Sequence, residues 1–234
     1  MHARCVTRTL ASRPGMRIAA TGETESGLVT DLAAVRAYAS DDGIEIDRAL
    51  RSSDPAAALA AAACVASGLG RLPSFRGVVY RIAAPPVELA AYQPGTVLTE
   101  PAFLTAIPSE DKAVPAGAAV AILSYTGRRT SGLELVGEPD TVVFAANTTF
   151  KVLARQAQGG PAGYVLLREV PAQQHGARSS GGLDDEDRDM AALLEQAMPG
   201  RTADGGRAGP LSYRHTFPVG RNDAGQPFGP ARSL

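Results

Sequence analysis

The chain has 234 residues, of which 44% are hydrophobic and 20% are charged, an ordinary balance for a soluble globular protein. Its formal net charge of -1 excludes a broad electrostatic surface for nucleic acid and argues against nucleic acid as a partner. The cysteines, Cys5 and Cys64, give neither a disulfide framework nor a zinc spacing, and no apolar run is long enough to span a membrane. We therefore expect no metal and no membrane partner. We expect a cytoplasmic location by default, with secretion by a route without a cleaved signal peptide as the alternative.

The first 26 residues are expected to form a flexible leader. The first 22 contain four arginines and no acid, and they lack the apolar core and cleavage site of a signal peptide. Residues 27–170 carry the pattern of one folded domain. Residues 171–234 are expected to be mostly disordered, with one short helix at about 183–198 whose acidic first turn suits the helix dipole.

Helices open the domain. Thr30 is placed to cap a first helix with a single apolar stripe at spacings of three or four residues. The stripe consists of Leu28, Leu32, Val35 and Tyr38. A short second helix is predicted over residues 44–50. The third begins with an Asp54 cap and Pro55 in the first helical position, continues through a run of alanines, and ends at Gly68 or Gly70.

From residue 77 the pattern changes to strands. Five segments are rich in β-branched and aromatic residues and are bounded by glycine, proline or asparagine, which is typical of strands. They cover residues 77–83, 119–125, 140–145, 149–155 and 163–170. Helices followed by a run of strands indicate an α+β fold with segregated layers rather than alternating β-α-β units.

Two polar side chains stand inside extended, apolar segments. Arg81 lies in "VVYRIA", where a guanidinium is costly to bury unless an anion answers it, and where it is suited to bidentate capture of phosphate. An exposed or salt-bridged arginine is the alternative. In "PAFLTAIPSED", the side chains of Phe103, Thr105 and Ile107 point the same way, which places one hydroxyl among apolar neighbours. A lone threonine in a strand is also an ordinary β-former.

Five segments in sequence order carry a resemblance to a known family. They are "LAAVRAYASDDGIEIDRALR", "GLGRLPSFRGVVYRIA", "YQPGTVLTEPAFLTAIPSED", "DTVVFAANTTFKVLAR" and "GYVLLREV". Together they resemble the ADP-ribosyltransferase fold of the Arg–Ser–Glu class, the group of clostridial-type toxins and arginine-specific transferases. In that order they match its helical opening, its arginine strand, its Phe-x-Ser-Thr-Ser segment, its Glu-Val-Leu-Phe-Pro-Pro-Gly-Thr-x-Phe segment and its closing strand.

The resemblance implies N-terminal helices followed by two small, mainly antiparallel β-sheets that form a cleft for NAD, which is the substrate. Such a domain cleaves the bond between nicotinamide and ribose and transfers ADP-ribose to a protein acceptor or to water. The resemblance implies that Arg81 binds the pyrophosphate. It also implies that Thr105, which keeps the oxygen of the family's first serine, orients the ribose and a carboxylate. That carboxylate stabilises the positive charge that develops on the ribose.

The acidic motif of the family is altered in this sequence. Counting back nine residues from Phe150 reaches Thr141, which carries no charge, and the position two residues earlier is Pro139. Ala106 and Ile107 replace the remainder of the Ser-Thr-Ser motif, which is a further departure. On a strict alignment, both acidic positions are lost.

A one-residue bulge between Asp140 and Phe144 would restore the motif as Glu138 and Asp140, because the faces of a strand alternate. Aspartate is one methylene shorter than glutamate, and a misplacement of about 1 Å can cost roughly 100-fold in rate. The candidate catalytic residues are Asp140, Glu138 and Thr105, and the candidate NAD-binding residues are Arg81 and Thr105.

Three functions remain open at this point. The first is an NAD-dependent mono-ADP-ribosyltransferase, or an NAD glycohydrolase if water is the acceptor. The second is a catalytically degenerate binding module that keeps the fold and a nucleotide site. The third is a domain that binds no nucleotide, with its cleft blocked by Phe103 or by the C-terminal tail.

Overall fold

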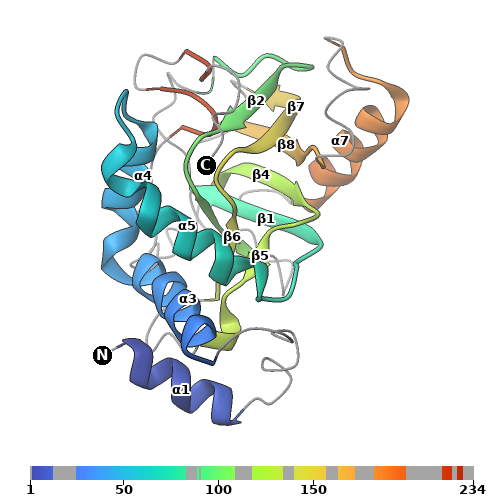
Figure 1. The fold of residues 1–234 in the computed structure, drawn as a ribbon. Coiled ribbons are helices and arrows are strands. Elements are labelled where there is room, and N and C mark those ends of the chain that lie inside the picture. Colours follow the sequence, from blue (N-terminus) through green and yellow to red (C-terminus); the bar gives the residue numbers. More distant parts are fainter. Residues whose placement is uncertain are drawn as a thin grey trace.

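The structure, a computed structural model, describes residues 2–12, 25–82, 89, 91–108, 118–133, 140–156, 163–171, 182–198, 218–222 and 226–228. Its helical elements are α1 (His2–Ser12), α3 (Glu25–Ala37), the π-helical turn η1 (Tyr38–Asp42), α4 (Gly43–Arg51), α5 (Ala56–Gly70), the 3-10 turn η2 (Ser131–Leu133) and α7 (Asp185–Ala197). Its strands are β1 (Gly77–Ile82), β2 (Val97–Glu100), β3 (Leu104–Pro108), β4 (Ala118–Ser124), β5 (Arg128–Arg129), β6 (Val142–Phe144), β7 (Thr148–Gln156) and β8 (Tyr164–Glu169). Helices precede strands, so the predicted α+β class is confirmed (Figure 1).

The strands of the described residues hydrogen-bond in the order β2-β7-β8-β4-β1-β3-β6-β5. The pairs are antiparallel except β4 with β8, which is parallel. Strands β3, β6 and β5 form one group and the other strands a second, and the β1–β3 pair joins the two groups. The two small, mainly antiparallel sheets are therefore joined through β1.

The first helix begins earlier than the sequence suggested. The stripe of Leu28, Leu32, Val35 and Tyr38 is fully buried, as predicted. The prediction that Thr30 caps this helix is wrong, because α3 begins at Glu25 and Thr30 lies inside it. Its hydroxyl donates to the Ser26 carbonyl at 2.9 Å, the local bond that a threonine makes within a helix.

Helices α4 and α5 lie where the sequence placed them. Asp54 accepts a hydrogen bond from the Ala56 N–H at 3.2 Å, and Pro55 stands immediately before the helix rather than in its first position. Gly68 allows α5 to approach α3, since a Cβ there would lie 2.3 Å from the Asp31 carbonyl oxygen. The two helices pack through this contact.

The structure differs from the flexible leader expected over the first 26 residues. Residues 2–12 form helix α1, whose Val6 and Leu10 are each 1% exposed. Both side chains belong to the hydrophobic cluster that also contains Leu28 and Leu32 of α3. An amphipathic helix that buries two large aliphatic side chains is stabilised by that burial. The proposed boundaries of the domain remain a prediction.

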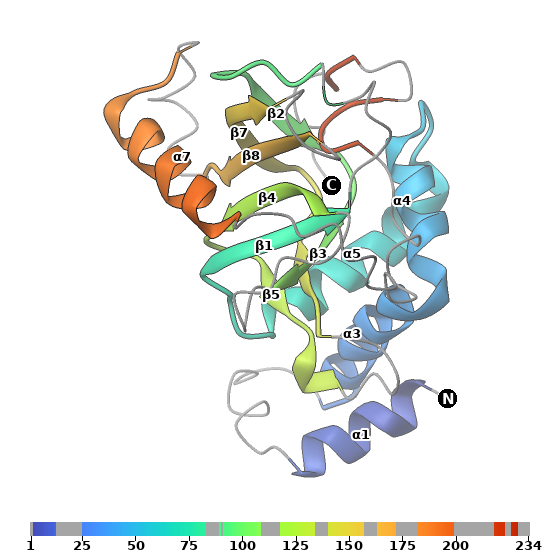
Figure 2. The ribbon, with the colours of Figure 1, turned by 180° about the vertical axis from the view of Figure 1, so that it is seen from behind.

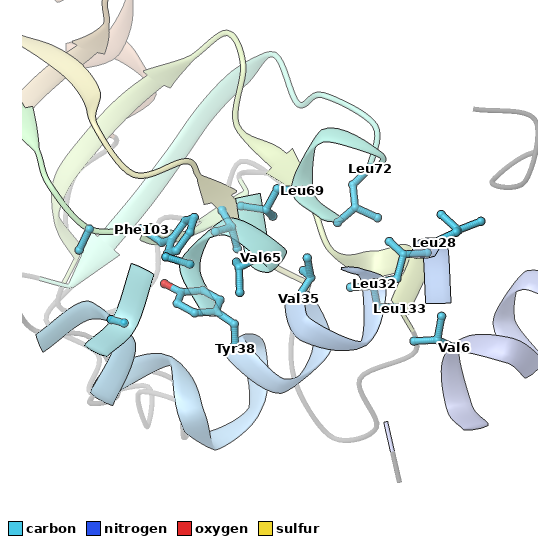
Figure 3. Close-up of a cluster of buried hydrophobic side chains, with 14 of the residues drawn as sticks. Val6, Leu28, Leu32, Val35, Tyr38, Val65, Leu69, Leu72, Phe103 and Leu133 are labelled. Carbon is cyan, nitrogen blue, oxygen red and sulfur yellow. The ribbon is translucent and has the colours of Figure 1, made fainter. Parts of the chain in front are cut away.

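The core lies in three layers of side chains. One cluster joins the helices to Phe103 and Val143, as Figure 3 shows for Tyr38 and Phe103. A second cluster lies on the other face of β3 and β6, and a third lies beneath α7. Helices α3, α4 and α5 are on one side of the sheet and α7 is on the far side (Figures 1 and 2).

Candidate functional site

Arg81 is buried rather than exposed. It lies near the end of β1 opposite Val120 of β4, and it is only 7% exposed. Burial lowers the pKa of its guanidinium, while the negative charge of Glu100 acts in the opposite direction. The negative charge of Glu100 therefore partly offsets the cost of burying the Arg81 guanidinium.

Glu100 is the charged group with the largest effect on the pKa of Arg81. It ends β2 and is fully buried, and its Oε2 accepts a hydrogen bond from Arg51 Nη2 at 2.6 Å. Its carboxylate also accepts the Ala102 N–H at 3.1 Å and the Gly220 N–H at 2.8 Å. Burial raises the pKa of Glu100 to about 7, although Arg51 and Arg81 both act to lower it. The carboxyl thus accepts from three donors in a site where burial disfavours its charged form.

Tyr38 lies beside Thr105. Its hydroxyl donates to Asp47 Oδ2 at 3.0 Å and lies 3.5 Å from Thr105 Oγ1. Burial, followed by the charge of Asp47, raises the pKa of Tyr38 well above its usual value, so the hydroxyl stays protonated. The structure thus places Thr105 within 3.5 Å of a buried, protonated tyrosine.

Asp140 lies elsewhere and has its own partner. It comes just before β6, and its Oδ2 accepts a hydrogen bond from Arg129 Nε at 2.5 Å. Val142 belongs to the cluster on one face of β6, and Val143 belongs to the helix-side cluster of Tyr38. Because faces alternate, Asp140 falls on the side of Val142, away from the face that Thr105 shares with its pairing partner Val143.

The bulge considered between Asp140 and Phe144 is not seen within β6. Phe144, Val143 and Val142 pair with Leu104, Thr105 and Ala106 in an unbroken register. Glu138 and Pro139 lie outside the described residues. Asp140 is therefore the described acid of the motif.

Thr141 takes the strand position on the face of Thr105. It is 4% exposed, and its Oγ1 lies 2.7 Å from the hydroxyl of Thr130. Its backbone carbonyl accepts the N–H of Thr130 at 2.9 Å. The position that a strict alignment assigns to the catalytic acid thus holds a neutral hydroxyl with a hydroxyl partner.

The described residues offer no other obvious cofactor site. They contain no group of three or more histidine, cysteine, aspartate or glutamate side chains that could hold a metal ion. None of the helices in the described ranges is long and apolar enough to cross a membrane. Guanidinium groups such as those of Arg81 and Arg51 are suited to bind an anion through paired N–H donors.

The local sequence does not reveal the role of Tyr38 or Glu100. Tyr38 reads as one more residue of an apolar stripe, and nothing in the local pattern sets it apart. Glu100 follows a short strand and resembles an ordinary loop acid, and its partner Arg51 is 49 residues away. The available signal was the position of Glu100, a charged residue at the end of a short strand and two residues before an apolar pair.

The fold is similar to that of several solved structures. The type III effector XopAI from Xanthomonas axonopodis pv. citri matches with a TM-score of 0.55 and 24% identity over 70% of this chain and 71% of its own. The ADP-ribosyltransferase Vis from Vibrio splendidus, in complex with an inhibitor, matches with a TM-score of 0.52 and 18% identity over 74% of this chain and 90% of its own. Exoenzyme S from Pseudomonas aeruginosa, in complex with human 14-3-3 protein beta and bound to carba-NAD, matches with a TM-score of 0.51 and 16% identity over 82% and 98%.

No protein-family model matches the sequence, and no curated protein matches it at a significant level. The identities to the solved structures are all below 25%, so their likeness establishes the fold alone. The chain has the ADP-ribosyltransferase fold, as its sequence resemblance indicated.

Proposed function

We propose that this chain is an NAD-dependent mono-ADP-ribosyltransferase-like protein, which cleaves the bond between nicotinamide and ribose and transfers ADP-ribose to a protein acceptor or to water. The observation that carries the proposal is the burial of Arg81 in β1, together with Thr105 placed 3.5 Å from the buried hydroxyl of Tyr38. Arg81 and Thr105 are the two residues that the sequence resemblance assigned to NAD, and they lie in a fold shared with ADP-ribosyltransferases. Exoenzyme S, of similar fold, binds carba-NAD.

Arg81 would hold the pyrophosphate. A guanidinium offers two parallel N–H donors to phosphate oxygens, and burial strengthens such bonds because water competes less. Thr105 would orient the ribose with its hydroxyl, and Tyr38, protonated and held by Asp47, would keep Thr105 in place. The positions of NAD atoms relative to these side chains are part of the proposal.

Cleavage requires a carboxylate beside the ribose, because the departing nicotinamide leaves an oxocarbenium-like ion. Asp140 is the described candidate, together with Glu138 in the sequence. In the structure Asp140 is paired with Arg129 and lies on the face of β6 away from Thr105, so its action on the ribose requires that this ion pair opens and that the carboxylate moves toward the ribose. The pair is partly buried, with side chains 30% and 21% exposed, so opening it costs more than the roughly 0–1 kcal/mol of an exposed pair.

The test is the release of nicotinamide from labelled NAD. Arg81→Gln removes the charge-assisted bonds, each worth about 1.5–3 kcal/mol, so we expect NAD affinity to fall by about 10- to 100-fold. Arg188→Gln is the matched control, because Arg188 is an exposed arginine paired with Asp185 on α7. Nicotinamide release no faster than in buffer, together with NAD binding that is equal in wild type and Arg81→Gln, would contradict the proposal.

Asp140→Asn separates the acid from its alternatives. If Asp140 acts on the ribose, this isosteric change slows nicotinamide release while NAD affinity is kept. Arg129→Gln frees the same carboxylate, so we expect it to leave release intact or to increase it. Equal release in wild type and Asp140→Asn would assign the reaction to Glu138 or exclude an acid of this motif.

A second function is favoured by the Arg129–Asp140 ion pair and by the neutral Thr141. A chain that binds NAD without turnover would be a degenerate binding module of the same fold. Calorimetry distinguishes the two: NAD binding with no nicotinamide released supports the module, and turnover excludes it.

A further inference from the structure

The C-terminal segment formed by residues 218–222 and 226–228, here the C-terminal cover, lies against the cluster around Arg81. Its Val219 and Arg221 are 2% and 7% exposed. In both views the segment, drawn in red, lies beside β2 and α4 (Figures 1 and 2). We propose that the cover occupies the anion-binding cluster in the absence of NAD and leaves it when NAD binds, a regulation that rests on the proposed function.

The cover binds the cluster through its backbone. Arg51 donates from Nη2 to the Pro218 carbonyl and from Nη1 to the Arg221 carbonyl, both at 3.0 Å. The Tyr92 hydroxyl donates to the Val219 carbonyl at 3.0 Å. In return, the Gly220 N–H donates to Glu100 at 2.8 Å.

The partners of the cover are also the groups that act on Arg81. Glu100 and Arg51 are the charged groups that act most strongly on the pKa of the Arg81 guanidinium, Glu100 raising it and Arg51 lowering it. Both groups bond to the cover: Arg51 donates to two of its carbonyls, and Glu100 accepts the Gly220 N–H. The cover and Arg81 therefore share one electrostatic environment, and a change in one is felt by the other.

The carbonyl oxygens of the cover occupy N–H donors of the Arg51 guanidinium. A guanidinium binds a phosphate by donating its N–H groups to two acceptor oxygens. The Nη1 and Nη2 groups of Arg51 already donate to two backbone carbonyls of the cover, and Arg81 is almost fully buried. A pyrophosphate gains these donors only when the carbonyls leave, so the cover and NAD compete.

The cover is held together by contacts within the segment itself. Arg221 pairs with Pro227, and the Asn222 N–H donates to the Gln226 carbonyl at 2.9 Å, so the segment closes a turn on itself. Among the described residues it adds no strand to the sheet order. Its removal breaks the contacts at the cluster and exposes Val219, which belongs to the core cluster of Leu98 and Tyr92, but it breaks no ladder of the fold.

Substitution of Gly220 is expected to displace the cover. Its φ is +65°, and a Cβ there would lie 2.7 Å from the Leu98 Cβ, so alanine both strains the backbone and collides with β2. Gly182→Ala is the matched control, because a Cβ at Gly182 meets nothing within 4 Å. Phe228→Ala is an independent variant, which removes the ring that Arg51 approaches at 5.5 Å.

The experiment is calorimetric titration of full-length protein with NAD, with hydrogen exchange of the amides in residues 218–228 as a second readout. We expect Gly220→Ala and Phe228→Ala to bind NAD about tenfold more tightly than wild type, because less of the free protein is covered. Gly182→Ala should match wild type. Saturation of wild type with NAD should speed amide exchange in the cover.

The outcomes separate the two proposals. Equal NAD affinity in wild type, Gly220→Ala and Phe228→Ala, or cover amides that NAD leaves unchanged, would overturn the cover and leave the proposed function standing. Weaker binding by both variants would show that the segment is a wall of the site, which also overturns the cover. No NAD binding by any of the proteins would overturn the proposed function and this inference with it.

Discussion

Arg81 and Glu100 are both buried, and each is stabilised as an ion by its neighbours. Arg51 contributes to both: it donates to Glu100 and adds positive charge beside Arg81. Removal of one member of a buried ion pair leaves an uncompensated charge, which is more costly than loss of the pair as a whole. The balance therefore belongs to the cluster rather than to a single residue.

Glu100 should make stability depend on pH. Its pKa is raised from about 4.5 in the unfolded chain to about 7 in the folded one. Between these values the folded state keeps a proton that the unfolded state has lost, so the free energy of unfolding falls as pH rises through the window. The contribution of one proton is at most about 1.4 kcal/mol per pH unit.

Glu100→Gln should remove this slope, since glutamine does not titrate. Denaturant unfolding of wild type and variant between pH 4.5 and 8 measures it, as the difference between the two curves. Glu45→Gln is the control, because Glu45 forms an exposed pair with Arg48 on α4. Parallel curves for wild type and Glu100→Gln would show that the carboxylate keeps its ordinary affinity for protons.

The local sequence predicts some elements of this fold well and others not at all. Helices α4 and α5 and strands β1, β4, β7 and β8 begin and end close to their predicted bounds, because propensity and periodicity agree there. Strand β5 has two residues and pairs with β6, so no pattern of its own could reveal it. Helix α1 was missed because its stability comes from packing on α3.

The candidate site divides in the same way. Arg81 and Thr105 could be singled out because each is a polar residue in an apolar strand, and their role in binding NAD, which the resemblance implies, stays a prediction. Tyr38 and Glu100 could not be singled out, since their meaning comes from partners far along the chain: Thr105 lies 67 residues from Tyr38. The face on which Asp140 lies depended on strand register, which the sequence left open between two alternatives.

Gly68 is the residue on which the contact of α3 and α5 depends. A Cβ there would lie 2.3 Å from the Asp31 carbonyl oxygen and 2.6 Å from Val35 Cγ2, so alanine must push the helices apart. We expect Gly68→Ala to destabilise the protein by about 2–3 kcal/mol, measured by denaturant unfolding. Gly70→Ala, two residues on, meets nothing within 4 Å and should be neutral or slightly stabilising.

A smaller effect at position 68 than at 70 would show that the helices do not meet at this glycine. The comparison is controlled for helix propensity, because both substitutions replace glycine by alanine in the last turn of α5. The difference between the two variants therefore reports the packing of α3 against α5.

At the scale of the whole molecule, two sides of the sheet have different attachments. The helices α3, α4 and α5 pack through hydrophobic side chains, with Tyr38 and Phe103 in edge-to-face contact at 5.1 Å between ring centroids. Helix α7, on the far side, adds a buried ionic anchor (Figures 1 and 2). Its Asp187 accepts from Lys151 Nζ and Arg168 Nε, each at 2.5 Å.

Asp187→Ala should loosen α7 without affecting the NAD site. The change leaves Lys151 and Arg168 buried without their anion, a loss of about 3–5 kcal/mol in the free energy of unfolding. Asp185→Ala, which removes an exposed carboxylate in the same turn, should cost far less. Because α7 lies on the other side of the sheet from Arg51 and α4, Asp187→Ala should speed amide exchange in α7 and keep the NAD affinity of wild type. A folded Asp187→Ala protein with weakened NAD binding would contradict this separation of anchor and site.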